Sequence, residues 1–209
     1  MFPPDNSYIY WVGLAGFFGG PRLRKLWNKF DNGKAAWNAD SSALADLNFQ
    51  TETIRQFMIW RDKEDPEHWL KNLESHAVKF ATLADQNYPE SLIHLADSPA
   101  IIFYQGNLPT NKKYLAVVGT RRPTNYARAT ALTISRGLSQ AGLPLISGLA
   151  RGIDAIAHEA ALEQGNETIA IIGSGLDKDN LYPREHWALA QNIISSGGCV
   201  MSEYPPGTS

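Results

Sequence analysis

The sequence predicts a mixed α/β protein in which a small all-helical domain precedes a doubly wound, mainly parallel β-sheet, and one observation supports each part. An apolar strand, a small-residue turn and an amphipathic helix follow one another three times between residues 114 and 194, and a fourth apolar strand comes next. Such alternation is typical of right-handed crossovers between parallel strands. Residues 8–76, in contrast, have helical spacing and almost no strand-like alternation.

The helical spacing of the first 77 residues predicts a small all-helical domain of the SAM or helix-hairpin-helix kind. Its segment GFFGGPRLRKLW (16–27) resembles the glycine hairpin and basic helix that hold a nucleic-acid phosphate, although a purely structural turn is the favoured explanation. The apolar stretch over residues 8–20 is too short to span a bilayer, so we expect no membrane partner. Much of the core is expected from Trp11, Trp27, Trp37, Trp60 and Trp69.

The second predicted domain covers residues 78–209. The segments VKFATLAD, YPESLIHLADSP and AIIFYQG predict two strands around a short helix. Parallel strands are then expected at 114–119, 143–147, 168–173 and 198–203. Helices connect them, ending at Gly142, at Gly165 and near Ile194. The first of these helices places four apolar residues on one face, which are Ala127, Ala131, Ile134 and Leu138.

The distribution of charge is more informative than its total. The formal net charge of −2 gives no reason to expect a polyanionic partner. Residues 98–153, however, contain no acid and seven bases, which are Lys112, Lys113, Arg121, Arg122, Arg128, Arg136 and Arg151. This block can present a positive surface to a polyanion, and scattered solvated arginines are the alternative. The single cysteine, Cys199, excludes a disulfide framework and a cysteine-based zinc site, and it fits a reducing, cytoplasmic setting.

The carboxyl ends of the four parallel strands predict an anion site. Ligands of open parallel sheets bind beyond these ends, where helix N-termini offer unsatisfied amides. The four segments there are rich in glycine, hydroxyl residues and arginine, and arginine binds phosphate bidentately. The candidate phosphate-binding residues are Gly119, Thr120, Arg121, Arg122, Ser147, Gly148, Arg151, Gly152, Gly173, Ser174, Gly175 and Arg184.

No motif in the sequence predicts catalysis, a metal or a cofactor. The patterns G-x-G-x-x-G, G-x-x-x-x-G-K-[ST], G-x-S-x-G and H-E-x-x-H are missing. Asp154 and His158 lie four residues apart on a predicted helix and could form an acid–base pair. We favour a structural role, in which Asp154 accepts the free amides of the first helical turn and His158 bonds to Asp154.

Four segments in order resemble the DNA-processing protein A family, also called Smf: VVGTRRPTNYA, SGLARGIDAIAHEAAL, TIAIIGSGLD followed by YPRE, and SEYPPGT. The resemblance covers about residues 78–209, and the helical part more loosely. It implies a Rossmann-like domain that binds single-stranded DNA without catalysis, forms a homodimer and delivers incoming DNA to the RecA recombinase in natural transformation. It also implies that Arg121 and Arg184 bind DNA, and that phosphates contact Gly119, Ser147, Gly148, Arg151 and Gly173.

Two departures from the family pattern limit this transfer. The loop GLDKDNLYP is longer than the family's Gly-Leu-Asp-Val-Tyr-Pro, so we expect it to reposition Arg184. Family members continue after SEYPPGT with Phe-Pro-x-Arg-Asn-Arg, so we expect a truncated or split product with weakened DNA binding and an uncertain dimer.

Two alternatives remain open. One is a nucleotide-binding enzyme, such as a phosphoribohydrolase on the lysine-decarboxylase-like Rossmann fold, although the signature Pro-Gly-Gly-x-Gly-Thr-x-x-Glu is missing. The other is an adaptor that uses the helical domain for protein contacts.

Overall fold

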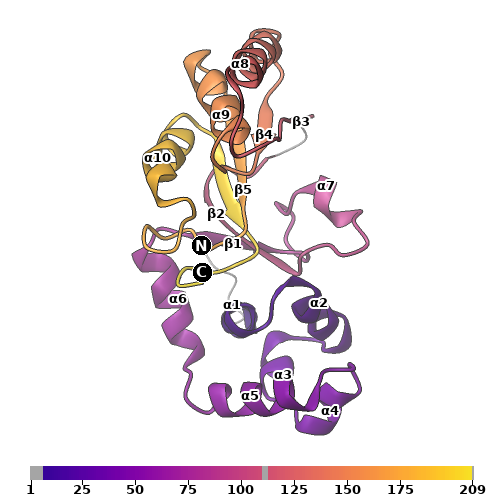
Figure 1. Ribbon diagram of the computed structural model, residues 1–209. Helices are drawn as coiled ribbons and strands as arrows, with labels where there is room; N and C mark the ends of the chain where they lie inside the picture. Colours follow the sequence, from indigo (N-terminus) through magenta and orange to yellow (C-terminus); the bar gives the residue numbers. More distant parts are fainter. Residues whose placement is uncertain (1–6, 110–112, 209) are drawn as a thin grey trace.

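The computed structural model describes residues 7–109 and 113–208, so Lys112 of the basic block lies outside the described residues (Figure 1). The helices are α1 (Ser7–Phe17), α2 (Gly20–Lys29), α3 (Gly33–Trp37), α4 (Ser41–Ala45), α5 (Thr51–Arg61), α6 (Pro66–Ser75), α7 (Glu90–Ile93), α8 (Asn125–Gln140), α9 (Ile153–Glu163), the 3₁₀ helix η1 (Arg184–His186) and α10 (Trp187–Ser195). The strands are β1 (Lys79–Thr82), β2 (Ile101–Gly106), β3 (Leu115–Ala116), β4 (Leu145–Ser147), β5 (Thr168–Ile172) and β6 (Cys199–Ser202).

Helices α1–α6 precede the first strand and form the lower part of the molecule in Figure 1. Helix α1 is apolar on all sides, and it lies inside this part against α3 and α6. Three of the other helices begin where a side chain accepts an amide of the first turn, namely those of Asn32, Asp40 and Asp65. As expected, Trp11 and Trp37 are buried.

One apolar core runs through the helices and the sheet. It joins Leu14 and Phe57 of the helical part to Ile101 and Val200 of the sheet. Polar contacts cross at the same place, because the Asn72 side-chain amide donates to the Pro206 carbonyl oxygen at 3.1 Å. The change of secondary structure after residue 77 is therefore not a break in packing, and a separate helical domain stays a prediction.

The six strands form one mixed sheet in the order β1-β2-β6-β5-β4-β3. The pairs β1–β2 and β2–β6 are antiparallel, whereas β6, β5, β4 and β3 are mutually parallel. This confirms the prediction of a mixed α/β fold with a mainly parallel sheet.

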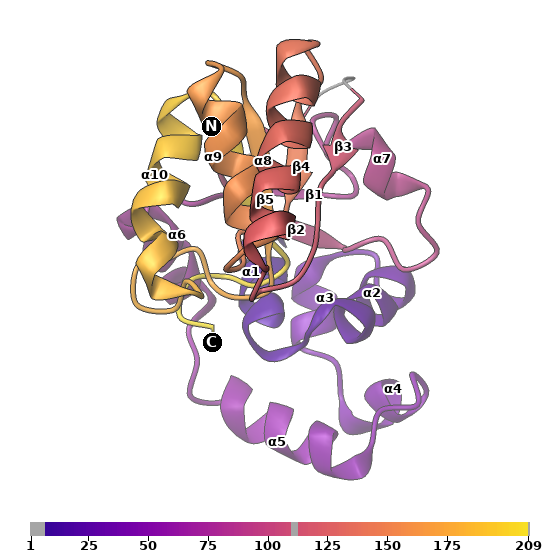
Figure 2. The same cartoon turned by 45° about the horizontal axis from the view of Figure 1, so that its top comes forward.

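The crossover helices α8, α9 and α10 lie on the same face of the sheet (Figure 2). Leu145 of β4 packs with Ala157 of α9 and Leu138 of α8, while α10 packs through Ile193 into the cluster that contains Val200. Right-handed crossovers that always step to the next strand in one direction leave their helices on one side. Among the described strands the order never reverses, so the predicted double winding is not seen.

The edge strand and its helix differ most from the sequence prediction. Strand β3 has two residues instead of the expected six, although the Val117 amide still donates to the Ile146 carbonyl at 3.0 Å. Helix α8 buries Ser135 and Ser139, while Ile134 of its predicted apolar face is 53% exposed. The reason is that α8 is the outermost helix and packs mainly on α9, with little contact to the sheet.

Within residues 7–109 and 113–208 we find no helix with the length and apolarity that a membrane crossing requires. Over the same residues, no group of three or more His, Cys, Asp or Glu side chains is placed to hold a metal ion.

Candidate functional site

Four segments follow the parallel strands at one edge of the sheet: 117–124, 148–153, 173–186 and 203–208. We call them together the rim. Backbone contacts join the segments, because the Ile153 amide donates to the Thr120 carbonyl at 3.2 Å and the Gly175 amide to the Thr208 carbonyl at 2.7 Å. His186 Nδ1 also lies 2.7 Å from the Leu149 carbonyl oxygen. The fold therefore brings the candidate residues onto one continuous surface.

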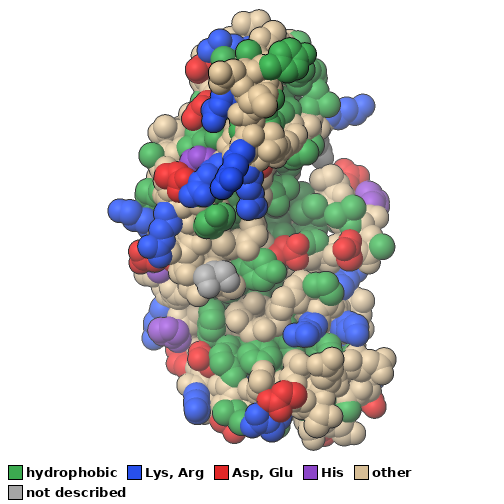
Figure 3. All heavy atoms as spheres, viewed as in Figure 1, with side chains coloured by type: hydrophobic (Ala, Val, Ile, Leu, Met, Phe, Trp, Pro, Cys, Tyr) green, Lys and Arg blue, Asp and Glu red, His purple; other side chains and the backbone are tan. Residues whose placement is uncertain are grey.

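Arg121 and Arg122 are exposed on the first rim segment. Thr120 orients this segment, since its hydroxyl accepts the Arg122 amide at 3.2 Å. Within the described part of the chain, neither guanidinium group has a hydrogen bond or an ion pair. Figure 3 shows Lys and Arg side chains gathered in the middle of the molecule, below α8 and α9. These two arginines are thus free to meet a phosphate.

The other two rim arginines already have partners. Arg151 forms an ion pair with Glu185, and its guanidinium lies 5.8 Å from the ring centroid of Tyr182. The hydrogen bond from Arg151 lowers the pKa of Glu185 to about 2, so this carboxylate is charged near neutrality. About half of each side chain of this pair is exposed, which allows an incoming phosphate to compete with Glu185.

Arg184 donates to the Asp179 carbonyl oxygen at 2.8 Å. Asp179 belongs to the long loop that distinguishes this chain from the family pattern, so the loop sets the position of Arg184. The sequence reasoning named Arg151 and Arg184 but missed Glu185, although its place next to Arg184 was visible.

The Asp154 carboxylate accepts hydrogen bonds from backbone amides in the segment that was predicted to bind phosphate. This carboxylate is buried, and its Oδ2 accepts the amides of Gly148 at 3.2 Å and Ala150 at 3.4 Å. The Gly148 amide is therefore not open to a ligand, contrary to the prediction. The position of Asp154 is that of a support for the second rim segment.

We expect the substitution Asp154→Asn to lower the free energy of unfolding by about 1–2 kcal/mol, because a neutral amide oxygen accepts more weakly than a carboxylate. Urea denaturation measures this change. The matched control is Asp46→Asn, at an exposed position after α4, which should be nearly neutral. Equal effects of the two substitutions would show that Asp154 does not support the segment.

His158 does not bond to Asp154. Its ring is fully buried, Nδ1 lies 2.9 Å from the Thr168 hydroxyl, and Nε2 has no partner among the described residues. Burial, with a smaller contribution from the charge of His186, lowers the pKa of His158 to about 3. The prediction of a hydrogen bond between His158 and Asp154 is therefore wrong, because α9 directs the His158 ring towards β5 and away from the rim.

Several small candidates hold the rim together and do not face a ligand. The Ser147 hydroxyl is buried and donates to the Val117 carbonyl at 2.6 Å. Gly152 has φ +83°, and a Cβ atom there would lie 2.3 Å from the Thr120 carbonyl oxygen. A Cβ atom on Gly119 would lie 2.7 Å from Ile153, and the Gly175 amide is used by Thr208. The geometry does not support phosphate contacts through the Ser147 hydroxyl or the Gly175 amide.

Gly173 and Ser174 border a cleft of about 410 Å³. Gly173 is exposed, and nothing lies within 4 Å of where its Cβ would be. The Ser174 hydroxyl accepts the Tyr182 amide at 3.3 Å. Tyr182 and Arg184 line the same cleft. A ligand can therefore reach the third rim segment beside an arginine.

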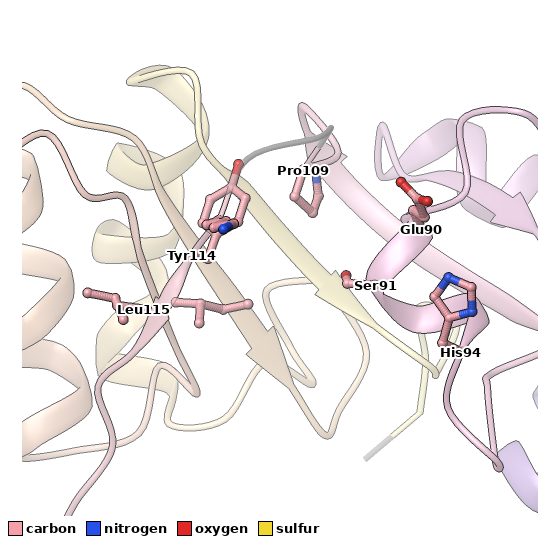
Figure 4. A pocket seen from close by; sticks show the side chains of 8 residues that line it. Glu90, Ser91, His94, Pro109, Tyr114 and Leu115 are labelled. Carbon is pink, nitrogen blue, oxygen red and sulfur yellow. The ribbon is translucent and has the colours of Figure 1, made fainter.

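A larger cleft, of about 760 Å³, lies away from the rim. Figure 4 shows it between α7, with Glu90, Ser91 and His94, and the start of β3, with Tyr114 and Leu115. Sequence reasoning did not find it, because only the tertiary fold brings these two segments together.

The turn between α1 and α2 packs against the last rim segment. A Cβ atom on Gly20 would lie 2.1 Å from Glu203 Oε2, so a carboxylate sits at the start of α2. Partial burial and the charge of Asp97 raise the pKa of Glu203. The carboxylate occupies the place that a phosphate would take in a helix-hairpin-helix, which favours the structural explanation of this turn.

Comparisons with known proteins agree on one group. The family model for DNA recombination-mediator protein A matches residues 79–209. Protein Smf of Synechocystis is 32% identical over 212 residues, which cover 98% of this chain and 52% of that protein. The DNA processing protein DprA of Streptococcus pneumoniae is 41% identical over 127 residues, 60% of this chain and 44% of that one. The chain thus spans about half the length of these curated relatives.

Two solved structures are similar. The X-ray structure of DNA processing protein A from Streptococcus pneumoniae has a TM-score of 0.73 at 30% identity. The match covers 100% of this chain and 70% of the Streptococcus chain. The second structure is of DNA processing protein A from Helicobacter pylori and is described as giving insight into its single-stranded DNA binding mode. It has a TM-score of 0.52 at 34% identity, and the match covers 63% of this chain and 58% of the Helicobacter chain.

Proposed function

Because the chain belongs to the DNA recombination-mediator protein A family, we propose that its rim binds single-stranded DNA through the backbone phosphates. The observation that carries this proposal is the pair of exposed guanidinium groups of Arg121 and Arg122 beside the start of α9, which have no partner among the described residues. The description of the similar Helicobacter pylori structure supports single-stranded DNA as the ligand.

We propose further that binding involves no catalysis. The two groups with the spacing of an acid–base pair are both engaged elsewhere, Asp154 by two amides and His158 by Thr168. A base with the lowered pKa of His158, buried away from the rim, is poorly placed to accept a proton from a ligand. The family match does not favour the alternative of a nucleotide-binding enzyme.

The cellular role that we propose is protection of incoming DNA and its transfer to the RecA recombinase in natural transformation, in the cytoplasm. The family description as a recombination mediator and the names of the relatives as DNA processing proteins support this role. The same proposal includes a homodimer, a Rossmann-like sheet and a distinct helical domain over residues 1–77.

The experiment is a fluorescence-anisotropy titration of a labelled oligothymidylate at several salt concentrations. We expect Arg121→Ala and Arg184→Ala each to weaken binding roughly tenfold, because a charge-assisted hydrogen bond to phosphate is lost. Each should also reduce the slope of log K against log salt by about 0.7.

The control is Arg55→Ala, which removes the same charge from an exposed ion pair with Glu52 on α5. It should leave affinity and slope unchanged. If the two rim variants also leave both quantities unchanged, the rim does not bind DNA.

A further inference from the structure

Two tyrosines stand apart from the other aromatic residues. Among the aromatic side chains in residues 7–109 and 113–208, only Tyr126 and Tyr182 are exposed, by 81% and 56%. All others in those ranges are buried or half-buried. Large aromatic rings contribute most when they are buried, so two mainly solvated rings need an explanation other than packing.

Both rings lie at the rim. Tyr126 is in the first turn of α8, four residues after Arg122 and just after the segment that carries Arg121 and Arg122. Tyr182 is in the third rim segment, two residues before Arg184, and it lines the 410 Å³ cleft with Gly173.

The contacts between rim segments place the two rings on one surface. The first segment touches the second where the Ile153 amide meets Thr120, at 3.2 Å. The second touches the third where Arg151 lies over the Tyr182 ring. The tyrosines therefore lie on either side of the second segment, Tyr126 close in sequence to Arg122 and Tyr182 in contact with Arg151.

Arg151 also fixes the Tyr182 ring. Its guanidinium is 5.8 Å from the ring centroid, a cation–π geometry, while more than half of the tyrosine remains exposed. A ring that is held in place but accessible loses little conformational entropy when a flat ligand stacks on it.

We propose that Tyr126 and Tyr182 stack on unpaired bases of the strand whose phosphates the rim arginines hold. This inference rests on the proposed function and deepens it, because it assigns base contacts to residues outside the predicted phosphate site. Stacking requires an accessible base face, which a single strand offers and a duplex covers with neighbouring pairs. Every base has such a face, so the contacts select single strands and tolerate any sequence.

The test compares two labelled probes of equal length: an oligothymidylate, and an oligomer whose central positions are abasic tetrahydrofuran units. Both carry the same phosphates, so they differ only in bases. We expect the wild-type chain to bind the oligothymidylate more tightly, by about 5- to 150-fold for each stacked base. Tyr126→Leu and Tyr182→Leu should each reduce this ratio, with the salt slope unchanged. Tyr126→Phe and Tyr182→Phe keep the ring and should preserve the ratio.

The outcomes separate this inference from the proposed function. Equal wild-type affinity for both probes overturns stacking, while the Arg121→Ala titration still decides phosphate binding. A leucine variant that weakens the binding of both probes equally also overturns stacking, since the lost contribution would then not depend on a base. Leucine variants that keep the wild-type ratio overturn it as well. If the wild-type chain binds neither probe, both proposals fail. Thermal unfolding of each variant confirms that the fold is intact.

Discussion

Replacing Gly152 by alanine is expected to lower the free energy of unfolding by about 3 kcal/mol or more. The backbone of Gly152 has φ +83° and ψ −122°, a conformation that L side chains rarely adopt. The new methyl group would also lie 2.3 Å from the Thr120 carbonyl oxygen and 2.9 Å from the Arg121 carbonyl carbon. Neither backbone atom can rotate away, so the first two rim segments must separate. Urea denaturation measures the loss.

Two other glycines separate the causes. Gly165 has φ +69° but nothing within 4 Å of its Cβ position, so Gly165→Ala reports the conformational cost alone, about 1 kcal/mol. Gly137 lies inside α8 with open space around it, so Gly137→Ala should raise stability by about 0.5–1 kcal/mol. If Gly152→Ala lowers the free energy of unfolding no more than Gly165→Ala does, then the first two rim segments are not in close contact at Gly152.

The buried ring of His158 should make the free energy of unfolding depend on pH. We expect it to lower this free energy by about 2 kcal/mol between pH 7 and pH 5. Burial keeps the folded-state pKa near 3, whereas the ordinary value for the unfolded chain is 6.5. Below pH 6.5 the unfolded chain therefore takes up a proton that the folded protein refuses until about pH 3. The contribution of the neutral ring to stability is fully present above pH 6.5 and is lost progressively as the pH falls towards 3.

The measurement is the free energy of unfolding in urea at pH 7 and pH 5, for the wild type and for His158→Leu. Removing the imidazole should shrink the difference between the two pH values by about 2 kcal/mol. His68→Leu, at an exposed position on α6, should leave that difference as it is. An unchanged difference in His158→Leu would mean that another group causes the acid sensitivity.

The elements that build the rim could be predicted because their signals are local. Apolar runs ending in glycine and hydroxyl residues predicted the parallel strands, and the helical period predicted α9. Which amides stay free could not be predicted in this way. Asp154 and Gly148 were both site candidates by residue type, yet only the folded geometry shows that the carboxylate of Asp154 accepts the amide of Gly148.

Features that depend on the neighbours of an element could not be predicted. The period of α8 places Ile134 on an apolar face, but burial also requires a sheet underneath, and α8 lies at the edge. The face on which each helix packs depends on strand order, which no local pattern encodes. The two exposed tyrosines were missed because aromatic residues usually indicate a core. Their signal was their place beside Arg122 and Arg184.

The order of the strands also has a consequence for how the chain folds. Each of β4, β5 and β6 pairs with the strand that precedes it among the parallel four, so these contacts join segments close in sequence. The pairing of β2 with β6 is different, because it places Phe103 opposite Ser202 and closes a very long loop. Loop-closure entropy makes such a contact slow to form. The parallel half can therefore assemble one unit at a time, and its junction with β2 is the step of high contact order that completes the sheet.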